Sequence, residues 1–499
     1  MVVRNRQRLG AIAKALSLVA ILAWAGALLL FGLHSTGSPM ILALAVAMVT
    51  SVFAILFRPI QGLVLLPFPA LMGPIYPVNV SGIGMITAAD LYLLSLATVF
   101  ILIDRRLFAP VLLGRCRHLL YAFSILLLFS WAFSDDIASS NHALANFIQL
   151  AAVYLLTLNL VRSADDVRRI LTGWLVAVTL CSLLTILKYY QLEPLLIANE
   201  VPRGVEDIGA LLLSSEYFFR ATFFYAGFFF ALAVTLIVIL SRIAGAETLS
   251  FPMQLLLLLS GLVNASALLV MNTKSAIYSI ALIGCFIVLG SIVRVKRDAV
   301  STLRTGRLIS GLAIITVGLM ALIPVFLVSQ QITTMFERFS STESLVQRLI
   351  VYKNALQELI SDEKIFIFGV GPDTIVRSPQ LQRVTNILTD PLTGLQEGTI
   401  DSTFLMVLLE LGVISFLILG ALMVFTMWSL FKRRRDVPGD VYGAIAGGIA
   451  VWLLTASTQY MGWAKISWLF AVLMAMAHFL AACRPSSKLI NVEIERNRP

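Results

Sequence analysis

The chain has 499 residues, of which 59% are hydrophobic and 13% are charged, and its formal net charge is +10. Apolar runs of about 20 residues recur from end to end, and each is long enough to cross the roughly 30 Å hydrocarbon core of a bilayer. This composition excludes a soluble globular protein and indicates an all-α, polytopic membrane protein. The positive charge is that of cytoplasmic loops facing anionic lipid, so it does not indicate nucleic-acid binding.

About fourteen membrane spans are predicted. The segment 60–76 is the weakest of them, because Pro67, Pro69, Gly73 and Pro74 can break the helix or make it re-enter the membrane. The predicted spans are residues 11–33, 39–57, 60–76, 85–103, 118–134, 143–161, 170–188, 220–241, 253–271, 275–293, 306–328, 403–428, 440–457 and 464–482.

Lys and Arg set the orientation of these spans. If the amino-terminal arginines are cytoplasmic, Arg168, Arg169 and the Lys432–Arg435 run also lie inside, as the positive-inside rule expects. The short outer loops 34–38, 77–84 and 135–142 then carry no Lys or Arg. We therefore expect both termini in the cytoplasm and the long polar segment outside, in a periplasm.

Three segments follow from this map. They are a transmembrane bundle of about 11 spans (1–328), a periplasmic loop with an amphipathic helix (329–402), and carboxy-terminal spans with a cytoplasmic tail (403–499). The four cysteines and four histidines are scattered, so neither a disulfide framework nor metal-ligand spacing is visible.

Two outward cations lie at span ends, at the depth of a lipid diphosphate. Arg220 opens the span 220–241, and Lys274 lies in the short Asn272–Ser275 connection between two apolar helices. A guanidinium binds phosphate oxygens bidentately, and the interaction is stronger where little water is present. The alternative is that both residues are ordinary interface anchors that reach phospholipid headgroups.

The polar segment has helical order of its own. Ser340 and Glu343 form an S-x-x-E capping box, and leucines then recur at helical spacing through residues 342–361. We expect this amphipathic helix to lie on the membrane face, with Arg348 pointing sideways into a groove; an exposed helix charge is the alternative. The turn Phe368–Pro372, Phe-Gly-Val-Gly-Pro, follows it.

Three carboxylates lie near outer span ends. Asp401 directly precedes the span 403–428, where it can cap the helix or act as a base. Glu410 lies about two turns inside that span, and Asp90 lies about five residues inside the outer end of another. Ionisable groups at such depths are costly, so they are candidates for function or for pairing with the outer cations.

In their order along residues 220–420, these elements resemble bacterial O-antigen ligases and polymerases. The resemblance rests on Arg220-Ala221-Thr222-Phe223, Thr273-Lys274-Ser275-Ala276, Arg348 in an outer helix, Phe368-Gly369-Val370-Gly371, and Asp401-Ser402-x-x-Leu405 before Glu410-x-Gly412. Asp401-Ser402 stands where the ligases typically carry a His-Asn-like pair, and Lys274-Ser275 stands where Ser-Arg is common. The chain is therefore more similar to the polymerases.

The resemblance implies a GT-C-like bundle and inverting glycosyl transfer without a metal or other cofactor. The donor would be an undecaprenyl-diphosphate-linked oligosaccharide, polymerised at the outer face of the bacterial inner membrane. Membrane lipids and a chain-length regulator or export machinery would be further partners, and nucleic acid would not. The implied catalytic residues are Arg220, Arg348 and Asp401, and the implied substrate-binding residues are Lys274, Arg338 and Glu410.

Other functions remain open. An O-antigen ligase would transfer the glycan to lipid A core, and a flippase would only move the lipid-linked oligosaccharide. Transporters commonly contain internal repeats with midplane binding, whereas this chain shows no matching halves and places its unusual charges at the outer face. Peptidoglycan glycosyltransferases use a similar donor but usually have fewer spans. A structural or assembly role is the last alternative.

Overall fold

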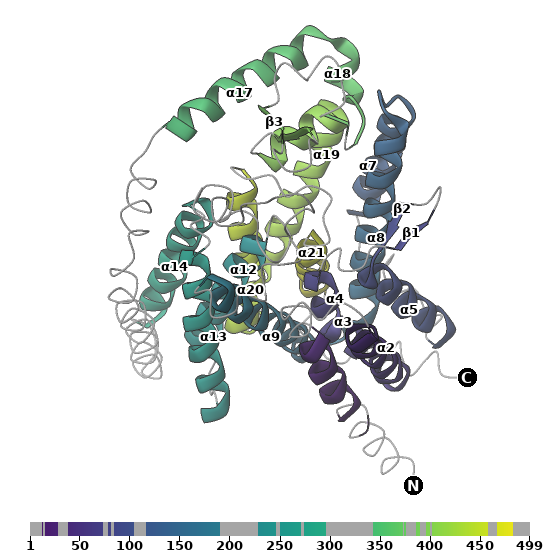
Figure 1. The fold of residues 1–499 in the computed structure, drawn as a ribbon. Helices are drawn as coiled ribbons and strands as arrows, with labels where there is room; N and C mark the ends of the chain where they lie inside the picture. The colour runs from purple at the N-terminus through teal and green to yellow at the C-terminus, as the bar shows by residue number, and fades with distance from the viewer. Residues whose placement is uncertain are drawn as a thin grey trace, which may run out of the picture.

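The structure is a computed structural model that describes residues 12, 15–27, 38–72, 78–80, 84–103, 116–189, 228–245, 250–270, 274–295, 343–372, 374–375, 386–389, 396–399, 402–457 and 467–482. As predicted, it is predominantly helical (Figure 1). After an apolar helix over Ala15–Ala27, the helices are α2 (Ser38–Phe57), α3 (Ile60–Leu65), α4 (Pro67–Met72), α5 (Ala88–Ile103), α7 (Cys116–Ala132), α8 (Ile137–Leu160), α9 (Ala164–Tyr189), α12 (Phe228–Gly245), α13 (Phe251–Val270), α14 (Lys274–Val295), α17 (Glu343–Ser361), α18 (Glu363–Phe368), α19 (Thr403–Lys432), α20 (Gly439–Ala456) and α21 (Ser467–Ala482).

Two short antiparallel ribbons interrupt the helical pattern, and the sequence did not predict them. Strand β1 (Val78–Val80) pairs with β2 (Gly84–Ile86), with Asn79 opposite Met85. Strand β3 (Asn386–Thr389) pairs with β4 (Gln396–Thr399) inside the predicted outer loop. Strands of three or four residues are too short for an alternation of apolar and polar residues to be recognised in the sequence.

Five of the described helices are long and apolar enough to cross a membrane, namely α8, α9, α13, α19 and α20. Shorter apolar helices cover most of the other predicted spans. The predicted span 306–328 lies outside the described residues, so the total of about fourteen spans and the GT-C-like arrangement stay predictions.

The segment with several prolines is broken, as its sequence suggested. Helix α3 ends at Leu65, Leu66 forms a turn, and Pro67 starts α4. Proline has no N–H and its ring clashes with the preceding turn, which favours a helix start at that position. Both pieces are almost wholly buried against α9 and α5, so the freed backbone groups lie inside protein.

Helices α12 and α20 form the centre of the main core. Small residues on α20 let the two backbones approach: a Cβ on Gly447 would lie 2.7 Å from Cγ2 of Ile237, and one on Gly443 would lie 3.0 Å from Oγ of Ser241. Close packing at small residues is the usual means of helix association in lipid, where burying apolar surface gives no driving force.

A buried histidine joins three further helices. His478 of α21 is 4% exposed, and its Nδ1 lies 2.7 Å from the hydroxyl of Tyr154 in α8. Its Nε2 lies 2.8 Å from Oγ1 of Thr426 in α19, which already donates its hydrogen to the carbonyl of Leu422. Thr426 must therefore accept from Nε2–H. His478 thus connects α8, α19 and α21.

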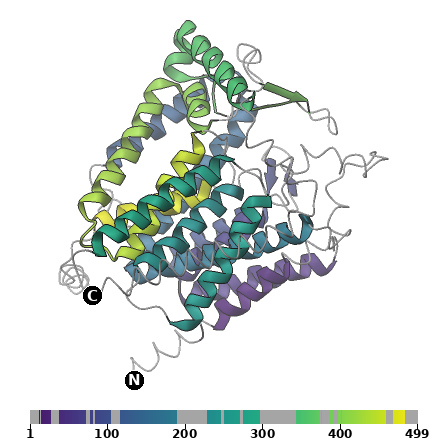
Figure 2. The same ribbon diagram turned by 90° about the vertical axis from the view of Figure 1, so that its left-hand side faces the viewer.

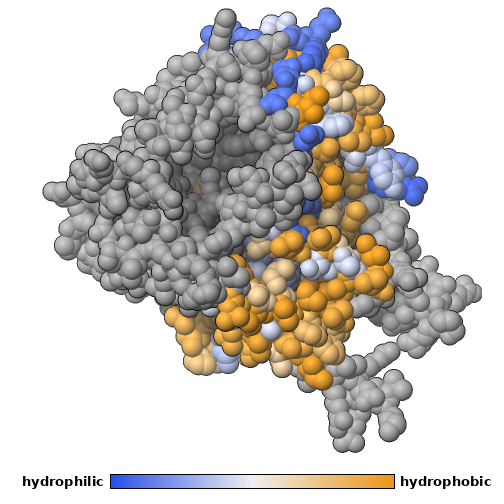
Figure 3. All heavy atoms as spheres, turned by 45° about the vertical axis from the view of Figure 1, so that its right-hand side comes forward, coloured by the Kyte–Doolittle hydropathy of each residue, from blue (hydrophilic) through white to orange (hydrophobic). Residues whose placement is uncertain are grey.

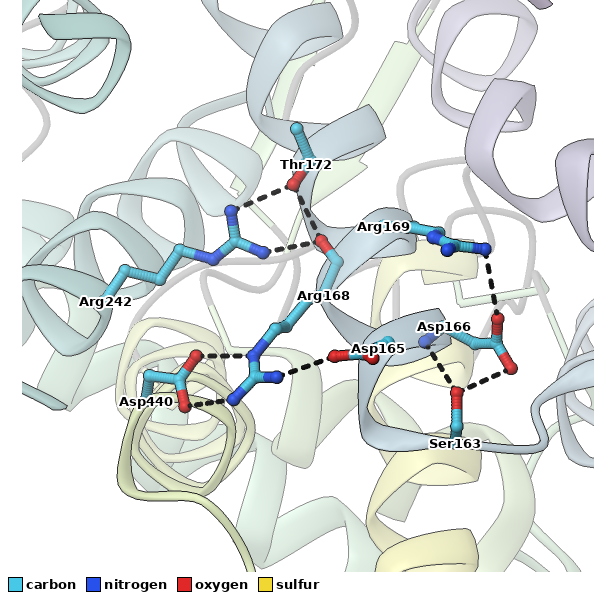
Figure 4. A network of polar contacts seen from close by, with 8 residues as sticks. All are labelled: Ser163, Asp165, Asp166, Arg168, Arg169, Thr172, Arg242 and Asp440. Carbon is cyan, nitrogen blue, oxygen red and sulfur yellow. Dashed lines mark hydrogen bonds and ion pairs between the residues drawn. The ribbon is translucent and has the colours of Figure 1, made fainter. Parts of the chain in front are cut away.

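An ion-pair network connects the ends of α9, α12 and α20 (Figure 4). The guanidinium of Arg168 binds both carboxylate oxygens of Asp440, with Nε–Oδ2 at 2.8 Å and Nη2–Oδ1 at 3.0 Å. Its Nη1 also lies 2.7 Å from Oδ1 of Asp165. Asp440 sits in the first turn of α20, where the helix dipole also favours a carboxylate.

Arg242, in the last turn of α12, completes the network although it is only 6% exposed. Its Nη2 donates to the backbone carbonyl of Arg168 at 2.6 Å, and its Nη1 donates to Oγ1 of Thr172 at 2.9 Å. Two arginines and two aspartates therefore lie together where the three helices meet, and each charge has partners of its own.

Outside this core, the described helices present apolar side chains to their surroundings. Leu94 and Ile101 of α5 are each 64% exposed, Phe286 of α14 is 64% exposed and Val424 of α19 is 68% exposed. Figure 3 shows such residues, in orange, over much of the described surface in that view. Large exposed apolar faces are what lipid-facing helices require.

Replacing Asp440 by Asn tests the network. The change leaves Arg168 and Arg242 without their shared carboxylate, and because the side chain of Arg168 is 37% exposed we expect a loss of about 1–3 kcal/mol rather than the larger cost of a dry ion pair. Asp165→Asn is the matched control, since that side chain is 70% exposed and should change stability by less than about 0.5 kcal/mol. Thermal unfolding in detergent measures both; equal effects would contradict the assignment.

Candidate functional site

The predicted site residues are described to different extents. Arg220, Arg338 and Asp401 lie outside the described residues. Lys274 is the first residue of α14 and Arg348 lies within α17, but their side chains are outside the description. Glu410 and Asp90 are described fully. The convergence of the predicted catalytic residues on one cavity therefore stays a prediction.

Asp90 has a local structural role. Its carboxylate accepts from the backbone N–H of Thr87 at 2.7 Å and from the Thr87 hydroxyl at 2.8 Å, and its own N–H lies 3.4 Å from that hydroxyl. This is a reciprocal capping arrangement at the start of α5.

Helix α19 is broken close to Glu410. Gly412 has φ +78° and ψ 171°, a conformation open essentially to glycine alone, and it separates Thr403–Leu411 from the rest of the helix. The break removes the usual N–H partners of the carbonyls just before it. Glu410 is 1% exposed and lies two residues before this glycine. Glu410, which the sequence predicts about two turns inside the span, thus lies next to the kink in α19.

The glycine-rich turn after α18 supplies the missing donors. The N–H of Val370 donates to the carbonyl of Leu409 at 3.0 Å, and the N–H of Gly371 donates to the carbonyl of Glu410 at 3.1 Å. A Cβ on Gly369 would lie 2.1 Å from the Glu410 carbonyl oxygen. The two backbones therefore touch directly, and a side chain at position 369 would prevent the contact.

The other edge of this turn binds the corner between α7 and α8. The carbonyl of Val370 accepts from the N–H of Asp135 at 3.0 Å, and the carbonyl of Pro372 accepts from Oγ of Ser140 at 2.9 Å. Ser130 of α7 donates to the carbonyl of Glu410 at 2.7 Å, so α7 also reaches the break itself. We call Phe368–Pro372 with the Leu409–Gly412 break the junction.

Lys364 of α18 adds an ion pair to the junction. Its Nζ lies 2.7 Å from Oδ1 of Asp135. Lys364 belongs to the segment 329–402 that the sequence predicts to be periplasmic, and this contact gives it a carboxylate partner. The sequence did not predict Ser130, Asp135 or Lys364 as site residues. Lys364 follows Asp362 and Glu363 at a helix start, but this local pattern cannot identify Asp135, 229 residues away, as its partner.

A small hydrophobic core fixes α17 to the first half of α19. It contains Ala355 and Leu359 from α17, Ile365 from α18, Val370 and Ile375 from the turn region, and Leu405, Met406 and Leu409 from α19. Figures 1 and 2 both show α17 and α18 lying together at one end of α19. The described part of the polar loop is therefore packed on the helix that follows it.

The predicted amphipathic helix is confirmed as α17, but its leucines do not all face the same way. Leu359 is 3% exposed, whereas Leu356 is 42% exposed. The buried face runs through Tyr352, Ala355 and Leu359, and a step of four residues back from Tyr352 reaches position 348. Position 348 thus continues the register of this face, and the side chain of Arg348 itself lies outside the description.

The cap of α19 is Ser402 and not Asp401. Ser402 has extended backbone angles, and its hydroxyl accepts from the N–H of Leu405 at 3.3 Å. The sequence had allowed Asp401 to fill this role. Asp401 itself lies outside the described residues.

The site offers hydrogen-bonding and charged groups but, within the described ranges, no group of three or more His, Cys, Asp or Glu residues that could hold a metal ion. No family model matches the chain, and no curated protein matches it either.

Replacing Gly412 by Ala tests the junction. The new Cβ would lie 2.1 Å from the carbonyl oxygen of Ile367, in a backbone conformation that costs about 1–3 kcal/mol for other residues. We expect loss of monodisperse protein or a clearly lower unfolding midpoint. Gly420→Ala is the control, because it lies in the same helix with nothing within 4 Å, and it should be neutral or stabilising by up to about 1 kcal/mol.

Proposed function

We propose that this protein polymerises undecaprenyl-diphosphate-linked oligosaccharide repeat units into a surface polysaccharide, as a glycosyltransferase that needs no metal. The observation that supports this best is the junction. It joins the helix that carries Arg348, the Phe-Gly-Val-Gly turn and the Glu410-x-Gly412 break, three elements of the resemblance that are separated in sequence.

The proposed reaction is a displacement at the anomeric carbon. An acceptor sugar hydroxyl attacks that carbon, its proton passes to the carboxylate of Asp401, and the bond to the lipid diphosphate breaks with both electrons staying on the phosphate oxygen. Arg220 and Arg348, assisted by Lys274 and Arg338, neutralise the charge that grows on the leaving group. A well-placed donor of this kind contributes about 10²- to 10³-fold in rate.

Two structural details support these roles. Ser402 takes the cap of α19, and Asp401 is the residue directly before it in the sequence. The hydrophobic core between α17 and α19 sets Arg348 on a helix that packs beside that same mouth. Glu410, buried at the break, is proposed to hold the shape of the substrate-binding region instead of taking a proton from the sugar.

The proposed location is the bacterial inner membrane, with both termini cytoplasmic and the α17–α18 region periplasmic. A lipid-linked donor would then keep its polyprenyl tail in the bilayer while its sugars reach the junction from the aqueous side. A chain-length regulator or export machinery would meet the protein on this face.

Purified protein reconstituted with a lipid-linked repeat unit tests the function. We expect longer glycans on a gel, and a drop of about 10²- to 10³-fold in rate for Arg220→Ala and Arg348→Ala, with a drop of about 10²- to 10⁴-fold for Asp401→Asn. Lys353→Ala is the matched control, because Lys353 is an exposed cation on α17, and its rate should stay near that of the unchanged protein.

The products also separate the alternatives. Transfer of a single glycan to lipid A core would identify a ligase, and movement of the donor across the bilayer without new bonds would identify a flippase. Near-normal polymer from all three variants would remove the site assignment even if polymerisation itself were observed.

Topology is tested by cysteine labelling in a background without native cysteines. Lys353→Cys lies at an exposed, charged position of α17 and should react with a membrane-impermeant maleimide in intact spheroplasts. Asp436→Cys, exposed beyond the end of α19, should react only after permeabilisation. The reverse pattern would place the α17–α18 region in the cytoplasm and contradict the proposal.

A further inference from the structure

The opposite end of α19 carries a group of cations beside exposed aromatic rings. Helix α19 ends at Lys432, and Arg433, Arg434 and Arg435 follow in a tight turn that leads into α20. The side chains of Trp428 and Phe431, in the last turns of the helix, are 55% and 45% exposed. We call Trp428, Phe431 and Lys432–Arg435 the basic end of α19.

The exposed rings continue an apolar face of the same helix. Leu417 is 61% exposed, Val424 is 68% exposed and Phe425 is 48% exposed, and they precede Trp428 at spacings that keep them on one side of α19. This is the stripe that a membrane-spanning helix turns toward lipid tails. Trp and Phe at its end stand where the tails give way to headgroups.

Two of the cations are held against these rings. Nζ of Lys432 lies 5.3 Å from the centre of the Trp428 ring, and Cζ of Arg434 lies 4.2 Å from the centre of the Phe431 ring. The rings themselves stack with centres 6.1 Å apart and an angle of 22° between their planes. Cation–π contacts of this kind restrict the cations before any ligand arrives, which lowers the entropic cost of binding.

The ion pairs of this region show which cations remain available. Arg433 pairs with Asp436 at 3.2 Å. Within the described part of the chain, no carboxylate lies within ion-pair distance of Lys432, Arg434 or Arg435. By contrast, Arg168 at the start of α9 binds two aspartates, one of them Asp440 at the start of α20. Arg168 therefore has carboxylate partners, whereas Lys432 and Arg434 lie against aromatic rings.

We propose that the basic end of α19 binds the headgroup of an anionic phospholipid. The phosphodiester would lie between Lys432, Arg434 and Arg435, and the acyl chains would follow the stripe that ends at Trp428 and Phe431. Charge complementarity and continuity with the apolar stripe point to a lipid in preference to a free phosphate, because a soluble anion would make no use of the exposed rings. This site lies at the other end of α19 from the junction and does not depend on the proposed function.

The test uses delipidated full-length protein in detergent, titrated with phosphatidylglycerol or phosphatidylcholine and followed by native mass spectrometry. The unchanged protein should bind phosphatidylglycerol more tightly than phosphatidylcholine. Each cation near a membrane surface changes affinity about fivefold, so Lys432→Gln/Arg434→Gln/Arg435→Gln should weaken phosphatidylglycerol binding about 100-fold. Arg433→Gln/Asp436→Asn, which removes a cation and its partner together, is the matched control and should bind as the unchanged protein does.

A second variant keeps the charges and removes the rings. Trp428→Leu/Phe431→Leu should weaken phosphatidylglycerol binding about two- to fivefold, and it provides a result if the triple variant does not fold. Equal affinity of the triple variant and the unchanged protein for phosphatidylglycerol would overturn the proposal. Complete release of bound phosphatidylglycerol by millimolar inorganic phosphate would also overturn it, since the site would then recognise a free anion.

Discussion

A helix that breaks inside an apolar bundle leaves carbonyl oxygens without N–H partners, and lipid offers none in exchange. Helix α19 meets this constraint with groups from elsewhere in the chain. The turn after α18 donates two backbone N–H groups to Leu409 and Glu410, and Ser130 donates its hydroxyl. Because glycines at 369 and 412 are needed for the backbones to touch, the break and the turn require each other. The packing of α17 on α19 and the position of the α7–α8 corner depend on this contact.

Charges are satisfied differently in different parts of the protein. In the interior, Arg168 and Arg242 have carboxylate, hydroxyl and carbonyl partners within one network. At the junction, Lys364 has Asp135. On the lipid-facing end of α19 the partners are aromatic rings, which leave the charge free to attract an anion. The kind of partner therefore distinguishes cations that hold helices together from cations that are available to a ligand.

Local features of the fold could be predicted from the sequence, because they depend on neighbouring residues. The apolar runs anticipate most of the described helices, the capping pattern anticipates α17, and Pro67 anticipates the break between α3 and α4. Ser402 as the cap of α19 was missed because Asp401 beside it is an equally good cap by residue type. The partner of Gly412 could not be predicted, since nothing near it indicates a turn some 40 residues earlier. Arg168 and Asp440 are 272 residues apart, and composition cannot pair them.

The contact between Ser130 and Glu410 spans 280 residues, which has a consequence for biosynthesis. At about 5–20 residues per second, the ribosome needs roughly 14–56 s after it has made Ser130 before Glu410 exists. During that interval the hydroxyl of Ser130 and, once made, the N–H of Asp135 lack the carbonyl partners that they have in the complete chain. The junction is thus among the last tertiary contacts to form. A nascent chain that stops before α19 would keep an incomplete surface there, one that quality-control proteases can recognise.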